Sequence, residues 1–68
     1  MNKTVSVLVE YDPDTRTYGA TSPDLPAVYA VSDNREDVIM RFERSADEYL
    51  RLTRDSADSE PRYVVAEA

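Results

Sequence analysis

Carboxylates are the most numerous side chains of this 68-residue sequence that could do chemistry: it contains 14 Asp and Glu against 8 Lys and Arg. The absence of His and Cys excludes disulfides, thiolate or imidazole metal sites, Cys nucleophiles and Ser-His-Asp triads. The carboxylates that could together bind Mg²⁺ are Glu10, Glu67 and one of Glu43, Asp47 and Glu48. Such a set would make a metal-dependent nuclease. A formal charge of -6 repels phosphate backbones, however, so we expect no enzymatic activity, no cofactor and no metal.

Three aspartates are candidates for contact with a partner protein. Asp12 and Asp14 flank Pro13, and Asp24 lies between two prolines. Exposed carboxylates there could pair with arginines of a basic protein, because complementary potentials speed association and select its orientation. Turn aspartates are also common for local reasons, since their side chains accept hydrogen bonds from nearby backbone N–H groups. Both interpretations stay open.

The first segments predict a β-hairpin. Residues 3–11 alternate between apolar and polar positions, as in a strand with one core face. That face is formed by Val5, Val7, Val9 and Tyr11. Residues 12–15 suit a type I turn with Pro13 at its second position. The second strand is expected from Arg16 to Ser22, where Gly19 would mark a bulge or a close backbone approach.

A stiff connector and a third strand come next. Residues 22–26 contain two prolines, which lack an N–H and restrict the residue before them, so this segment cannot continue a paired strand. Ala27 to Val31 is a run of five apolar residues with β-branched and aromatic members, which predicts a strand. We expect Val28 and Ala30 to face the core.

A helix is predicted from Arg35 to Arg54, with Asn34 as its N-cap. Its apolar stripe consists of Val38, Ile39, Phe42, Ala46, Tyr49, Leu50 and Thr53. Two acid-first pairs are spaced for i, i+4 contact: Asp37 with Arg41 and Asp47 with Arg51.

The remaining residues complete a single domain, residues 1–68. Polar residues 55–61 are typical of a linker, and Arg62 to Glu67 predicts a short last strand. The order βββαβ predicts an α+β fold: a three-stranded antiparallel meander, one helix packed on a face, and a short fourth edge strand. The last strand is expected beside the first and parallel to it.

An apolar patch is expected on the sheet face opposite the helix. With these registers Leu8, Tyr29 and Val31 lie there, and they would contact a partner or a second copy unless the register is mistaken. A core this small supplies only about 3–5 kcal/mol, so we expect a homo-oligomer. The longest apolar run is five residues and no export signal is recognisable, so we expect a cytoplasmic protein without membrane contact.

Most of the chain, from about Val5 to Leu50, resembles the HicB-like antitoxins of bacterial toxin–antitoxin pairs. The resemblance is carried by four segments: residues 9–14, 18–20, 22–26 and 32–37, of which Pro23-Asp24-Leu25-Pro26 is the most specific. The chain departs from the family pattern at Ala27, where Gly is usual, and at Asn34, where Thr is common. It also ends at Ala68, without the DNA-binding domain that many members carry after the last strand.

The resemblance implies a degraded ribonuclease-H-like half-fold that binds a small basic RNA-cleaving toxin of the HicA type. The expected function is therefore neutralisation of that toxin by masking its surface, with no direct contact to nucleic acid by this chain. The alternative is a stand-alone oligomeric module, structural or regulatory, without a toxin partner.

Overall fold

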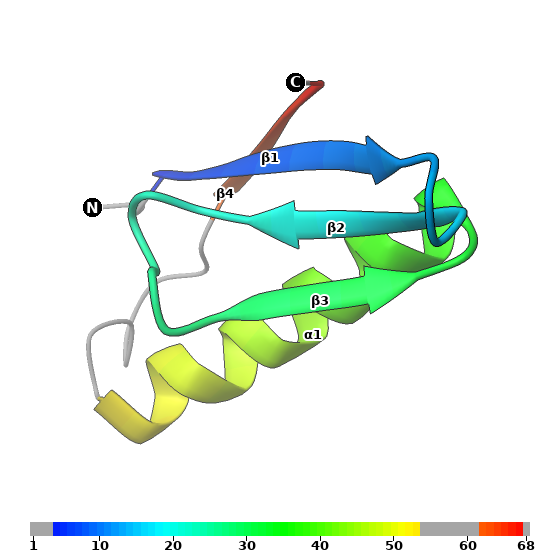
Figure 1. The fold of residues 1–68 in the computed structure, drawn as a ribbon. Coiled ribbons are helices and arrows are strands. Elements are labelled where there is room, and N and C mark those ends of the chain that lie inside the picture. Colours follow the sequence, from blue (N-terminus) through cyan, green and yellow to red (C-terminus); the bar gives the residue numbers. More distant parts are fainter. Residues whose placement is uncertain (1–3, 54–61, 68) are drawn as a thin grey trace.

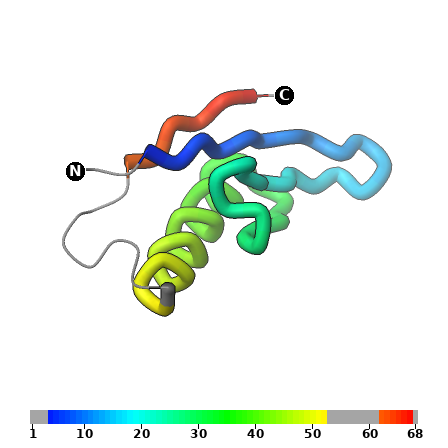
Figure 2. The backbone as a smooth tube through the Cα atoms, turned by 90° about the vertical axis from the view of Figure 1, so that its left-hand side faces the viewer, coloured from blue at the N-terminus to red at the C-terminus, as the bar shows by residue number. Residues whose placement is uncertain are grey.

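The computed structural model describes residues 4–53 and 62–67. Its elements are β1 (Thr4–Asp12), β2 (Thr17–Thr21), β3 (Tyr29–Ser32), α1 (Arg35–Thr53) and β4 (Arg62–Glu67). The strands form one sheet in the order β3-β2-β1-β4, with α1 along one face (Figures 1 and 2). β1 pairs antiparallel with β2 and parallel with β4. The predicted α+β class, the element order and the place of the last strand are confirmed, whereas the predicted linker, residues 55–61, lies outside the described residues.

The core lies between the sheet and α1. Alternation along the strands and steps of three and four along the helix bring small and branched side chains together. The buried apolar residues are Val5, Val7, Val9, Ala20, Leu25, Val28, Ala30, Val38, Phe42, Ala46 and Leu50. The inward positions predicted for Val28 and Ala30 are confirmed. Among the stripe residues, Ile39 is partly buried, Tyr49 is 36% exposed, and the Thr53 side chain lies outside the described part of the structure.

The hairpin differs from the prediction in two details, and it excludes one of the two alternatives for Gly19. Tyr11 is 52% exposed, so its core assignment was wrong; its ring packs instead against Tyr18, with 4.9 Å between centroids. The second strand begins at Thr17, because Arg16 adopts a positive φ of 58° and belongs to the turn. Gly19 forms no bulge, since the ladder between β1 and β2 continues without interruption through its pairing with Glu10.

The connector folds back through local hydrogen bonds. The Ser22 hydroxyl accepts from the Asp24 N–H at 3.1 Å, and the Leu25 carbonyl accepts from the Val28 N–H at 3.0 Å. This last bond closes a turn that contains Ala27 and Val28. The third strand therefore begins at Tyr29, two residues later than predicted.

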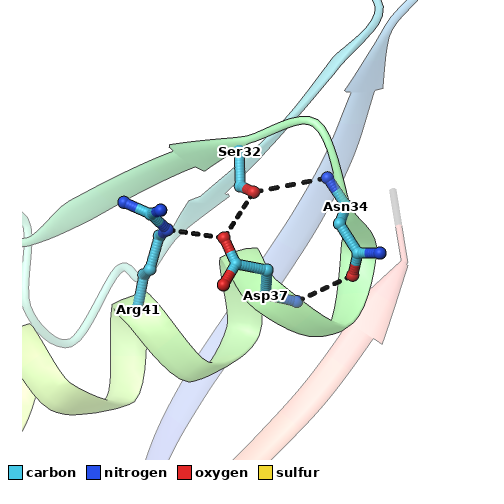
Figure 3. Close-up of polar contacts among 4 residues, drawn as sticks. All are labelled: Ser32, Asn34, Asp37 and Arg41. Atoms are coloured by element: carbon cyan, nitrogen blue, oxygen red, sulfur yellow. Dashed lines mark hydrogen bonds and ion pairs between the residues drawn. The ribbon is translucent and has the colours of Figure 1, made fainter.

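The start of α1 has the predicted cap (Figure 3). The Asn34 side chain accepts from the Asp37 N–H at 3.0 Å, and the Asn34 carbonyl accepts the first helical hydrogen bond. The Asp37 carboxylate accepts from the Ser32 hydroxyl at 2.6 Å and from Arg41 Nε at 2.5 Å, which confirms the Asp37–Arg41 pair. These two hydrogen bonds, that of Ser32 first, hold the pKa of Asp37 below its ordinary value. The cap thus ties the end of β3 to the first turns of the helix.

The side chains of Tyr63 and Glu67 tie β4 to α1. The Tyr63 hydroxyl donates to the Asp47 carboxylate at 2.6 Å, and Arg35 forms an ion pair with Glu67. The predicted Asp47–Arg51 pair was wrong, because Asp47 is directed to Tyr63 across the sheet edge instead. Within residues 4–53 and 62–67, no helix is long and apolar enough to cross a membrane.

Candidate functional site

The sheet face opposite α1, which we term the open face, contains the predicted apolar patch. Because Val5, Val7 and Val9 point to the helix, the alternate residues point away from it. The registers align one row across all four strands: Tyr29, Thr21, Leu8 and Ala66. Residues in such a row are nearest neighbours on one surface, so the patch is continuous across the sheet.

The apolar members of the open face are well exposed. Tyr29 is 70% exposed and Val31 is 54% exposed, whereas Leu8, on the inner strand β1, is half-buried. Their placement agrees with the predicted registers, while their role in binding stays a prediction. The sequence reasoning missed Val64, which is 50% exposed and adds to this face. The face to which Val64 belongs follows only from the parallel register with β1, in which Ser6 lies opposite Val64.

A hollow of about 450 Å³ lies at the hairpin end of the open face. Its lining residues are Glu10, Tyr11, Asp12, Pro13, Thr17, Tyr18, Gly19, Thr21 and Val31. Gly19 is central, because it is the cross-strand partner of both Glu10 and Val31. A Cβ built on Gly19 would meet no atom within 4 Å, so the hollow exists where a side chain is missing.

The carboxylates near this hollow belong to the hairpin. Asp12 accepts a hydrogen bond from the Asp14 N–H at 3.0 Å through one carboxylate oxygen, as a turn aspartate does. Both aspartates are exposed, and Asp12 lies four residues along β1 from Leu8, about 13 Å at the usual rise of a strand. Glu10 lies between Leu8 and Asp12 on the open face. Glu10 and Asp12 therefore lie beside the row of Tyr29, Thr21, Leu8 and Ala66, towards the hairpin end of the open face.

Asp24 lies at the other end of the sheet and has a structural partner. Its carboxylate accepts from the backbone N–H of Ser6 at 2.9 Å. Since Leu8 pairs with Thr21, continued pairing would bring Pro23 opposite Ser6, but β2 has ended there. The Asp24 side chain thus replaces the strand that the prolines interrupt. The structure does not group Asp24 with Asp12 and Asp14.

The carboxylates of the nuclease alternative are not brought together. Glu10 lies on the open face, whereas Glu43 and Asp47 lie on α1 behind the sheet. Asp47 accepts from the Tyr63 hydroxyl, and Glu67 pairs with Arg35. Burial and the neighbouring Asp47 raise the pKa of Tyr63 well above its ordinary value, so this phenol stays protonated. Among residues 4–53 and 62–67, no group of three or more acidic side chains is placed to hold a metal ion.

A second hollow of about 300 Å³ lies beside β3, between the connector and the last turns of α1. It is lined by Ala27, Val28, Tyr29, Ser45, Glu48, Tyr49 and Leu52. Leu52 is 78% exposed. The outer edge of β3, which contains no charged residue and no proline, runs next to it. Such an edge can accept another strand.

Comparison with known proteins found no matching family model, no matching curated protein and no matching solved structure.

Proposed function

We propose that this chain is a protein-binding module of the antitoxin type, which neutralises a small basic RNA-cleaving toxin by covering its surface. The observation that carries the proposal is the row Tyr29, Thr21, Leu8 and Ala66 on the open face, with Glu10 and Asp12 beside it towards the hairpin end. An apolar centre with a charged border is the usual anatomy of a protein interface. Occlusion needs no catalytic group, only this kind of surface.

The charge distribution supports a basic partner. The net charge is -6, and Glu10 and Asp12 lie two and four residues along β1 from Leu8, on the same face. Opposite charges at the border of an interface accelerate encounter and select its orientation more than they add affinity. We place this function in the cytoplasm, where such a toxin would meet its RNA substrates.

A second candidate function is self-association without a toxin. The observation that favours it is the outer edge of β3, which pairs with no other described strand, beside the hollow at Tyr49 and Leu52. Two copies joined by antiparallel β3 strands would extend the sheet across a two-fold axis. Light scattering of the isolated chain distinguishes a monomer from such a dimer.

The test of the toxin-binding proposal is co-expression with the product of an adjacent short basic reading frame, followed by an RNA-cleavage assay. We expect a stable complex in which RNA cleavage is abolished. Tyr29→Ala should weaken the complex about tenfold or more, since exposed tyrosines in interfaces are frequent hot spots. Met40→Ala, which removes an apolar side chain 56% exposed on α1, is the matched control and should leave affinity unchanged.

Two results would contradict the proposal. The first is a basic neighbour that cleaves RNA equally well in the presence of this chain. The second is an equal loss of affinity in both variants, because that would point to a general effect on the fold rather than to the open face.

A further inference from the structure

The single glycine of the sequence has no conformational reason to be a glycine. Gly19 lies in the middle of β2, within a regular ladder on both sides, and its φ is not positive. No neighbouring atom lies within 4 Å of a Cβ at this position. A strand-interior glycine lowers stability relative to a β-branched residue, because it loses more backbone entropy and offers no side chain to pack. Gly19 therefore leaves a gap on the open face that no described side chain fills.

The residues that line the gap determine which kind of side chain could bind there. The hollow of about 450 Å³ is lined by two carboxylates, those of Glu10 and Asp12, and by no basic residue. Neither carboxylate forms an ion pair with another described residue. Val31 supplies an apolar wall directly across from Glu10, with the bare backbone of Gly19 between them. The site thus combines an apolar floor with uncompensated negative charge.

We infer that this hollow receives an arginine side chain of a partner protein. The inference rests on the proposed function, in that it specifies how a basic partner is recognised on the open face. The aliphatic part of the arginine lies over Gly19 and against Val31, and the guanidinium reaches the two carboxylates. Glu10 and Asp12 are two residues apart on the same side of β1, so their backbones are separated by about 7 Å. A guanidinium between them can donate to both, at about 2.8 Å each.

Arginine fits this site better than lysine for a geometric reason. Its planar group carries five donors in a fixed fork, whereas the lysine ammonium is a compact point charge that pairs best with one acceptor group. A hollow formed by a missing side chain also favours the flat guanidinium, which packs against apolar surfaces.

The test uses the intact chain and two short peptides, hexa-arginine and hexa-lysine, titrated into ¹⁵N-labelled protein. We expect hexa-arginine to shift the amide signals of Glu10, Gly19 and Val31, and to bind more tightly than hexa-lysine. Gly19→Val should lower the affinity for hexa-arginine about tenfold or more by filling the hollow, without lowering the melting temperature. Glu10→Gln should reduce the same affinity while leaving the hollow open. Ser6→Val, on the same face but four residues from Glu10, is the control and should change neither property.

The outcomes separate this inference from the proposed function. Unshifted Gly19 and Val31 signals in the wild type would overturn the arginine site, as would equal binding of hexa-arginine by wild type and Gly19→Val. Shifts spread evenly over all acidic loops would overturn it too, because they would report only bulk charge. If the peptide binds at Gly19 and the adjacent basic protein does not bind at all, the arginine site stands and the toxin-binding proposal fails.

Discussion

Asp24 allows a direct test of whether a carboxylate serves the fold or a partner. Sequence reasoning made it a candidate for partner contact, yet its carboxylate accepts the Ser6 N–H at 2.9 Å. Asp24→Ala removes this bond and leaves the Ser6 N–H to water. A hydrogen bond to a charged acceptor contributes about 1.5–3 kcal/mol, and solvent exposure lowers this, so we expect a loss of about 1 kcal/mol.

The expected loss converts into a measurable change of melting temperature. Unfolding entropy is about 2.1 cal/mol/K per residue, or about 140 cal/mol/K for 68 residues. A loss of about 1 kcal/mol then lowers the melting temperature by about 7 °C. Circular dichroism during heating measures this directly. Asp24→Asn keeps an acceptor oxygen and should lose less.

The control for charge is Asp33→Ala, which removes an exposed aspartate near the start of α1. If Asp24→Ala and Asp33→Ala unfold at the same temperature, the hydrogen bond to Ser6 contributes nothing and the reasoning is refuted. If Asp24→Ala unfolds early and also binds the partner weakly, suppressor mutations in the core that restore stability should restore binding. A direct partner contact would stay lost.

Two further predictions concern the turn and the helix cap. Arg16→Gly should stabilise the protein by about 0.5–1 kcal/mol, or about 4–7 °C, because glycine adopts the positive φ of 58° without the steric conflict of a Cβ; an unchanged or lower melting temperature would contradict this. Asp37→Asn should lower stability at neutral pH and remove part of its acid dependence. The folded-state pKa of Asp37 is depressed by Ser32 and Arg41, so its contribution is present above about pH 4 and disappears as pH falls through that lowered pKa. Urea unfolding between pH 2 and pH 7 should show the wild-type and Asp37→Asn curves converging in acid, and parallel curves would exclude the proposed linkage.

The parts of the fold that could be predicted have strong local signals. The alternating valines of β1 and the three-and-four spacing of α1 each define one buried face, and Asn34 has the side chain that a helix start requires. The parallel place of β4 followed from topology, since a crossover helix carries the chain to the far edge. These features agree with one another, which is why the α+β arrangement could be derived without a relative.

The errors arose where tertiary contacts override local pattern. Tyr11 continues the alternation of the valines, but its ring packs on Tyr18 rather than under the helix. Asp47 has a favourable partner in Arg51, yet the Tyr63 hydroxyl, distant in sequence, takes its carboxylate. Arg16 adopts a left-handed conformation that its residue type does not signal. None of these contacts could be read from neighbouring residues.

Only part of the candidate site could be predicted from the sequence, for a related reason. Leu8, Tyr29 and Val31 could be assigned to one face by period-two alternation, whereas the place of Val64 depended on a parallel register. Gly19 was noted as a strand glycine, but only the three-dimensional structure distinguishes its two interpretations. The continuous ladder eliminates a bulge, and the space above the Gly19 backbone is free of described atoms.

The distribution of side-chain size on the two faces of the sheet supports an external use of the open face. Towards α1, the inner strands contribute Val5, Val7, Val9 and Ala20, which are small enough to pack closely against the helix. Away from α1, the larger Tyr29 is 70% exposed. A chain selected only for its own stability would gain from a polar residue of high β propensity at Tyr29, like the threonine at position 21. It would also gain from a β-branched residue at Gly19. Exposed apolar area and an unfilled hollow at the hairpin end of the open face are together unfavourable for an isolated domain, and both become favourable once a complementary protein surface covers them.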